Sequence, residues 1–219
     1  MSATRTLDVV DIDVGRIVQQ IGIYRNDPTH DRTDRSFAKA VLTPDGPGTM
    51  RLSWDVDGDV QARAWGDGAR WLLDRADAWV GLRDDLTGFD PTVHPNVERW
   101  WRDHRRVRLP SNVERRRAEA TLPALPGIGA WTATATVLAS HGDPDVIVLR
   151  DYGMPTMVND AFTGDSKRLD PDRGGDDVMA AHLDPWTGHR LRIVRLVLAA
   201  GIAVPRRAPK AYNPDVRRF

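Results

Sequence analysis

The chain has 219 residues, with 15 Pro, 18 Gly, 8 Trp and no Cys, and its 31 basic residues balance its 31 acidic ones. The absence of Cys excludes disulfides, thiolate zinc sites, cysteine nucleophiles and cysteine-held iron–sulfur clusters. No apolar run approaches the ~18 residues that a membrane span needs, and the N-terminal sequence is acidic rather than a basic region followed by an apolar core. We therefore expect a soluble, cytoplasmic protein without a signal peptide, large enough for one core or two small ones.

Charge is unevenly distributed along the chain. Residues 43–90 hold 10 acids and 5 Arg, a net of −5, whereas residues 98–119 hold 8 Arg and 4 acids, a net of +4. Residues 189–219 hold 7 Arg, one Lys and one Asp, a net of +7. An acidic segment in the first half and basic segments in the second half fit a protein that presents one face to an anion. Coding bias toward Arg explains the same composition, so charge alone leaves the partner open.

The first half is expected to form a small α+β unit. Three short β-prone runs lie at 37–43, 49–54 and 60–65. Turn sequences separate them at 44–48 and 57–58. The acids around the second turn do not match a calcium-binding EF-hand loop, which needs Gly at its sixth position and Glu at its twelfth, so a hairpin turn is expected. A helix should follow, with one apolar stripe at Ala69, Leu72, Leu73, Ala76 and Val80.

The second half is expected to be helical. A connector rich in Pro and Asp at 84–97 marks a boundary, and the predicted domains are 1–90 and 91–219. Helices are expected at 95–106, 113–122, 131–140, 152–161, 175–183 and 187–200. The polar stretch between 163 and 175 has no periodicity and is expected to be a loop.

The most informative stretch is 125–133, Leu-Pro-Gly-Ile-Gly-Ala-Trp-Thr-Ala, a turn between two predicted helices. Gly127 and Gly129 can adopt positive φ and leave no Cβ between the backbone and an approaching group. The second helix begins near Ala130, so its free N–H groups and its dipole favour an anion such as a DNA phosphate. The residues alone leave a tight αα-hairpin without a ligand as an equal alternative.

This stretch resembles the helix-hairpin-helix of the DNA glycosylase superfamily, and within it the alkyl-purine branch, the 3-methyladenine DNA glycosylase II group. The resemblance continues through 142–145, 150–152 and 184–190, and the N-terminal half, notably 43–48, resembles the TBP-like β domain of that branch. It covers most of the chain, and its most specific element is the hairpin together with an Asp about 20 residues later. The resemblance implies an α+β protein, in which a TBP-like antiparallel β/α domain precedes an abbreviated all-α helix-hairpin-helix domain. It also implies a monofunctional DNA glycosylase that hydrolyses the N-glycosidic bond of alkylated purines in duplex DNA, as in base excision repair.

Three residues carry the chemistry that the resemblance implies. Asp151 matches the catalytic carboxylate, which would stabilise the cationic sugar or orient the attacking water. Because Asp151 precedes a predicted helix, an N-cap is the alternative. Trp131 stands where related enzymes that also nick the backbone have a Schiff-base lysine, so hydrolysis without a lyase step is implied. Trp131 and Tyr152 are candidates for the base pocket, with core packing as the alternative for each.

The hairpin is also implied to hold ions. The residues matched to phosphate binding are Gly127, Ile128, Gly129 and Thr132. The family holds a monovalent cation through hairpin carbonyls, which here match those of Pro123, Leu125 and Ile128, so a structural Na⁺ or K⁺ is expected and no other cofactor. The spacing of the six His matches no zinc site, so no transition metal is predicted. The expected partner is duplex DNA containing alkylated bases, bound by a monomer without contact to a membrane.

One departure from the family lies before the hairpin. In the family several helices precede it, and one carries the wedge side chain that fills the gap left by the flipped base. Here the chain runs almost straight from Arg108 into the hairpin, as if several tens of residues had been removed near Asn112. A missing wedge would leave base extrusion without its main compensation. Two alternatives to an active enzyme follow: a DNA-binding remnant without turnover, and a helical interaction module that kept the hairpin as a fold element.

Overall fold

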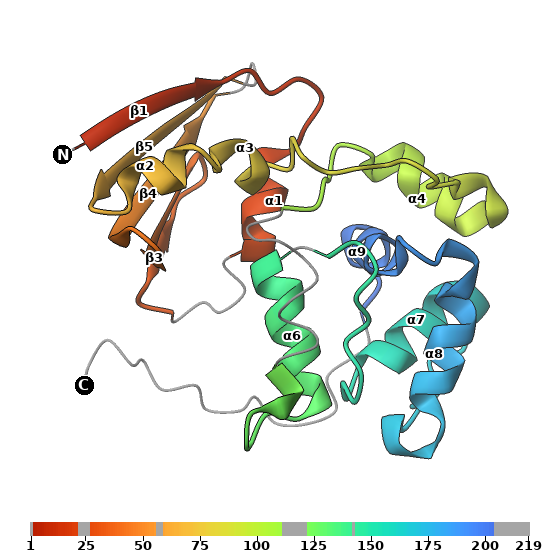
Figure 1. The fold of residues 1–219 in the computed structure, drawn as a ribbon. Helices are drawn as coiled ribbons and strands as arrows, with labels where there is room; N and C mark the ends of the chain where they lie inside the picture. Colours follow the sequence, from red (N-terminus) through yellow and green to blue (C-terminus); the bar gives the residue numbers. More distant parts are fainter. Residues whose placement is uncertain (1, 22–26, 56–58, 111–121, 142, 204–219) are drawn as a thin grey trace. The chain divides into compact units, whose positions relative to one another are not determined.

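The computed structural model describes residues 2–21, 27–55, 59–110, 122–141 and 143–203. Within these residues the chain forms two compact units, one of residues 2–84 with 106–110 and the other of residues 85–105 with 122–203. The first holds a five-stranded antiparallel sheet with short helices, and the second is helical (Figure 1). The expected α+β class is therefore confirmed, while the TBP-like and hairpin details and the domain limits 1–90 and 91–219 stay predictions.

The sheet of the first unit has the strand order β1-β5-β4-β3-β2. Its strands are β1 (Ser2–Leu7), β2 (His30–Arg32), β3 (Ser36–Thr43), β4 (Gly46–Trp54) and β5 (Val60–Gly66). The last three confirm the three β-prone runs, and the first predicted turn joins β3 to β4 through Gly46, whose φ is +111°. The other predicted turn, at 57–58, lies outside the described residues. The edge strands β1 and β2 were not predicted, because they are short or polar and lack apolar alternation.

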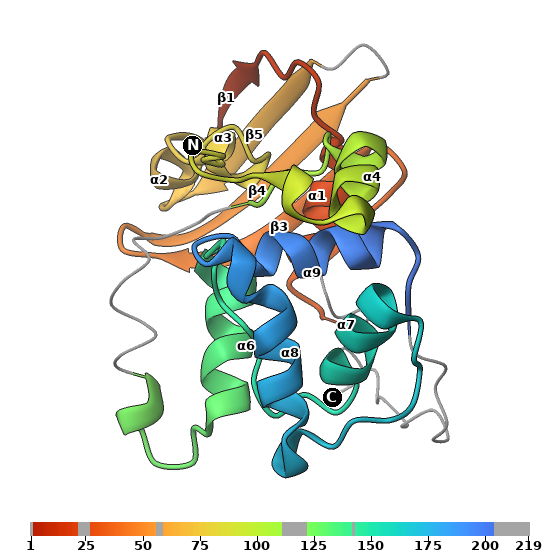
Figure 2. The same cartoon turned by 90° about the vertical axis from the view of Figure 1, so that its right-hand side faces the viewer.

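Three helices cover one face of this sheet (Figures 1 and 2): α1 (Val14–Ile21), α2 (Ala69–Leu73) and α3 (Ala76–Trp79). Their apolar side chains pack on alternate residues of the central strands, such as Met50 and Leu52 of β4, which are fully buried. The predicted single helix over 69–80 is wrong, since the chain breaks between α2 and α3. The apolar stripe was identified correctly, but both short helices contribute to it.

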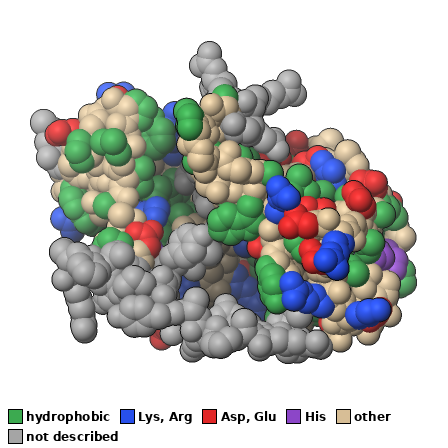
Figure 3. Space-filling model, turned by 90° about the horizontal axis from the view of Figure 1, so that it is seen from below, with side chains coloured by type: hydrophobic (Ala, Val, Ile, Leu, Met, Phe, Trp, Pro, Cys, Tyr) green, Lys and Arg blue, Asp and Glu red, His purple; other side chains and the backbone are tan. Residues whose placement is uncertain are grey.

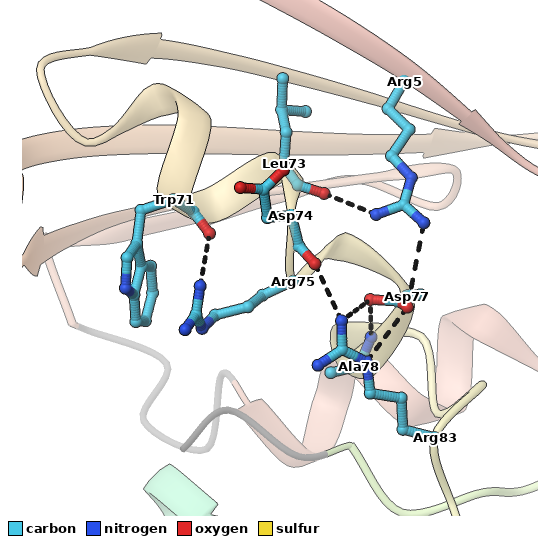
Figure 4. A network of polar contacts seen from close by, with 8 residues as sticks. All are labelled: Arg5, Trp71, Leu73, Asp74, Arg75, Asp77, Ala78 and Arg83. Atoms are coloured by element: carbon cyan, nitrogen blue, oxygen red, sulfur yellow. Dashed lines mark hydrogen bonds and ion pairs between the residues drawn. The ribbon is translucent and has the colours of Figure 1, made fainter. Parts of the chain in front are cut away.

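A polar network holds the break in place (Figure 4). The guanidinium of Arg83 donates to both carboxylate oxygens of Asp77, at 3.1 and 2.8 Å, and to the carbonyl of Asp74 at 2.8 Å. Arg5 of β1 donates to the carbonyl of Leu73 at 2.9 Å. Carbonyls left without a helical partner at the break are thus satisfied by arginines.

The second unit contains α4 (Pro95–His104), α6 (Ala130–His141), α7 (Met154–Thr163), α8 (Gly175–Leu183) and α9 (Arg190–Ala199). Its described residues also form 3₁₀ turns: η1 (Pro91–Val93) before α4, and η2 (Leu122–Ala124), η3 (Pro171–Arg173) and η4 (Asp184–Trp186) between helices. The predicted helices are confirmed apart from shifts of a few residues at their ends; the one at 113–122 lies almost wholly outside the described residues, as does Asn112.

The core of this unit comes from α4, α7, α8 and α9, and α7 lies beside α8 (Figure 2). Helix α9 begins later than predicted because Gly188 has a φ of +95° and separates it from η4. Trp186 is buried in this core and donates its Nε1–H to the carbonyl of Asp90 at 2.7 Å, so it is a packing residue. None of the helices in the described ranges is both long and apolar enough to cross a membrane.

Candidate functional site

The turn before α6 has a left-handed φ at Gly127 and not at Gly129, and the helix predicted before the turn lies almost wholly outside the described residues. The N–H of Leu125 donates to the carbonyl of Leu122, and the N–H of Ile128 donates to the carbonyl of Leu125, both at 3.1 Å. Gly127, between them, has a φ of +85°, a left-handed conformation that favours glycine. The turn therefore needs glycine at this position for its own conformation.

The space outside this turn is open. A Cβ built on Gly127 or on Gly129 would meet no heavy atom within 4 Å. The first helical bond of α6 runs from the N–H of Ala133 to the carbonyl of Gly129, at 3.0 Å. The N–H groups of the first three residues of α6 therefore lack an intrahelical acceptor and lie at the positive end of the helix dipole. This arrangement can accept an anion, and Ile128 and Thr132, the other residues matched to phosphate binding, are half-buried beside it.

Asp151 has both of its carboxylate oxygens in hydrogen bonds. Its Oδ1 accepts the N–H groups of Gly153, at 2.9 Å, and of Met154, the first residue of α7, at 2.8 Å. The side chain therefore satisfies a free N–H at the start of α7 from two residues before the N-cap, which is Gly153. Its Oδ2 accepts the indole Nε1–H of Trp131 at 3.2 Å. Gly153, not Asp151, is thus the N-cap of α7, and Asp151 joins the start of this helix to the predicted pocket residue on α6.

Trp131 and Tyr152 are both accessible. Trp131 is 42% exposed and Tyr152 is 60% exposed, so core packing describes neither residue. The guanidinium of Arg168 lies over the Tyr152 ring, 4.2 Å from its centroid. Two aromatic rings near one carboxylate can bind a flat, electron-poor group.

Arg150, next to Asp151, is held in an unusual conformation. Its φ is +58°, and its N–H donates to Asp176 at 2.9 Å. Its guanidinium donates twice to Oδ1 of Asp172, at 3.0 and 2.7 Å, and these bonds and the charge of Asp172 raise the pKa of Arg150. Neither acid was predicted, because both lie more than 20 residues further along the chain and no local pattern links them to Arg150. Basic and acidic side chains are likewise intermixed on the side of the helical unit seen in Figure 3.

A second anchor connects the loop before Asp151 to α9. The carboxylate of Asp145 accepts Nε and Nη2 of Arg190, at 2.7 and 2.6 Å, and the N–H of Gly188 at 2.7 Å. Burial alone would raise the pKa of Asp145, but the hydrogen bonds and charge of Arg190 and the backbone N–H groups lower it on balance. Two of the segments that carry the resemblance, 142–145 and 184–190, are therefore in contact.

The predicted cation would be bound by backbone carbonyls. Carbonyl oxygens are ligands that suit Na⁺ and K⁺. The Leu125 oxygen already accepts the N–H of Ile128, and it keeps a second lone pair. The carbonyls of Pro123, Leu125 and Ile128 are thus chemically suited to the ion, which stays a prediction. In the ranges that the structure describes, no cluster of three or more His, Asp or Glu side chains could hold a metal ion.

Comparison with models of protein families and with curated proteins found no match for this chain.

Proposed function

We propose that the chain is a monofunctional DNA glycosylase that hydrolyses the N-glycosidic bond of alkylated purines in duplex DNA. The observation that supports this best is the 3.2 Å hydrogen bond from Trp131 to Asp151, because it brings together the hairpin helix and the carboxylate 20 residues later. Either motif alone is weak, and their contact is a feature that this function requires.

The hairpin supplies the contact to the DNA backbone. A phosphate would accept the free N–H groups at the start of α6, and the open space at Gly127 and Gly129 allows its close approach. Such a contact reads no sequence, as suits an enzyme that acts on damaged bases in many contexts.

Asp151 supplies the charge for the reaction. Two backbone N–H groups occupy Oδ1, whereas Oδ2 accepts only the Trp131 N–H among the contacts described above, so Oδ2 keeps a lone pair for the substrate. As the bond between C1′ and the base nitrogen breaks, the base leaves with the bonding electrons and the sugar becomes cationic. The carboxylate stabilises this cation, and water adds to C1′ and loses its proton. An alkylated purine already carries positive charge, so it leaves with little acid assistance.

Trp131 and Tyr152 would bind the extruded base. Their exposed rings can stack on an electron-poor purine. Trp131 has no amine with which to form a Schiff base, so the reaction ends at the abasic site.

The second candidate is a DNA-binding remnant of the same family without turnover. The capping bonds of Asp151 favour it, since a capping role alone accounts for an Asp at this position. A remnant would bind duplex DNA with an affinity that falls steeply as salt rises, and it would release no base.

Incubation with methylated duplex DNA separates the two candidates. We expect the wild-type chain to release free 3-methyladenine or 7-methylguanine and Asp151→Asn to release neither. Equal release by both proteins would contradict the role of Asp151. No release by a folded, DNA-bound wild-type chain would leave the remnant.

A further inference from the structure

The sheet of the first unit has a second face, opposite to its three helices, which we call the open face. The pairing register and the buried alternate residues assign each strand residue to a face. The open face is rich in hydroxyl side chains, which come from Ser2, Thr4, Thr6, Ser36, Thr49 and Ser53. Its two arginines and its one tryptophan lie on β4 and β5.

The two arginines are direct cross-strand neighbours. Arg51 of β4 pairs in register with Arg63 of β5, and both side chains are exposed. Neither guanidinium has a hydrogen bond or an ion pair with another residue of the described ranges. The one acid among the strand residues of this face, Asp31, is separated from Arg51 by Ala38. Like charges directly opposite one another destabilise a sheet, so Arg51 and Arg63 repel each other. An anion bound between the two guanidinium groups would offset this repulsion.

An aromatic ring lies beside this pair. Trp65 is two residues after Arg63 on β5, on the same face, and pairs in register with Thr49. Trp65 is 38% exposed and is not part of the core, so packing does not require a large aromatic side chain at this position. Cations with an adjacent exposed ring are the combination by which proteins bind single strands, because the cations take phosphates and the ring stacks on a base.

We propose that the open face binds single-stranded nucleic acid, with phosphates at Arg51 and Arg63 and a base stacked on Trp65. A single strand fits better than a duplex, because the bases of a duplex stack on one another and leave no face for the indole. The hydroxyl side chains around the arginines can donate further hydrogen bonds to the backbone. This site lies in the first unit and does not depend on the function proposed for the hairpin.

The test measures binding of a fluorescein-labelled oligo(dT) to the full chain by anisotropy, over a range of salt concentrations. Loss of two phosphate contacts in Arg51→Gln/Arg63→Gln should reduce the slope of log affinity against log salt by about 1.4, at ~0.7 per contact. Trp65→Ala should weaken binding about 5- to 150-fold with the slope unchanged, since it removes stacking only. The matched control Arg70→Gln, at an exposed arginine of α2, should change neither quantity.

A hairpin variant, Gly129→Ala, assigns the binding to one of the two units. Binding of oligo(dT) should persist in this variant; its loss would overturn the proposal, as would an unchanged salt slope in the double arginine variant. Tighter binding of a duplex than of oligo(dT), with no effect of Trp65→Ala on either, would also overturn it. If the double variant does not fold, each single variant should still lower the slope by about 0.7. If the chain releases no base from methylated DNA, the glycosylase proposal fails, but the expected results of these oligo(dT) measurements do not change.

Discussion

The indole Nε1 of Trp131 donates a hydrogen bond of 3.2 Å to Oδ2 of Asp151, and this bond connects the first turn of α6 to the N-terminus of α7. Trp131 can thus act in two ways, by stacking its ring on a base and by orienting the carboxylate through its N–H. Side chains that keep only one of these properties separate the two roles.

Trp131→Phe keeps an aromatic ring and removes the N–H. We expect the single-turnover rate of base release to fall about tenfold while the Kd for DNA stays unchanged, because a hydrogen bond to a charged group contributes about 1.5 kcal/mol or more. Trp131→Ala, which also loses stacking, should reduce the rate further and weaken binding of damaged DNA. A wild-type rate in the Phe variant would show that Trp131 acts by its ring alone.

Asp151→Asn and Asp151→Ala separate catalysis from helix capping. The side-chain oxygen of Asn can accept the same N–H groups of Gly153 and Met154, so its variant should keep nearly the stability of the wild type, whereas Ala should lower the free energy of unfolding by about 1 kcal/mol. Both variants should lose base release, because neither carries a negative charge. Urea unfolding and release assays on the same preparations check the two effects, and a fall in release that only tracks stability would favour capping alone.

The two glycines of the hairpin should respond differently to the same substitution. Gly127→Ala forces a Cβ into a φ of +85°, which should cost about 1–2 kcal/mol of stability. Gly129→Ala meets no neighbouring atom and has no left-handed φ, so its stability should stay unchanged. Its methyl group would nevertheless enter the space for a phosphate, and we expect several-fold weaker binding of duplex DNA. Thermal melts and duplex anisotropy test this, and wild-type duplex affinity in Gly129→Ala would argue against a phosphate at the hairpin.

The Asp145–Arg190 pair predicts a dependence of stability on acid. The folded-state pKa of Asp145 lies below its ordinary value of about 3.9, so its contribution is present above about pH 4 and is lost as the pH falls through the folded-state pKa. Asp145→Asn should therefore be less stable than the wild type at pH 7, and the difference should shrink below pH 4. Urea unfolding at several pH values measures it, with Asp184→Asn, at an exposed aspartate, as the control. A difference independent of pH would exclude a charge effect.

Local patterns in the sequence were sufficient for the main elements of both units. β-prone runs separated by turn residues predicted β3, β4 and β5, and the bounds of α8 agree with the predicted helix 175–183. The glycines at 127 and 129 predicted the turn before α6, because a left-handed φ and an open backbone are properties of the residue itself. The N-cap expected at Asp151 is instead Gly153, and Asp151 accepts the N–H groups of Gly153 and Met154.

Contacts between distant residues were decided by the tertiary structure alone. Arg150 donates hydrogen bonds to Asp172 and Asp176, and Trp131 donates one to Asp151. These bonds join residues 20 or more positions apart, so they depend on how the helices pack. The neighbouring positions of Arg51 and Arg63 depend on strand register, since a shift by one residue would turn one of them to the opposite face. Composition and periodicity assign a residue to an element and to one face of that element. They do not say which residue of another element lies beside it, because that depends on how the chain turns back and how the elements pack.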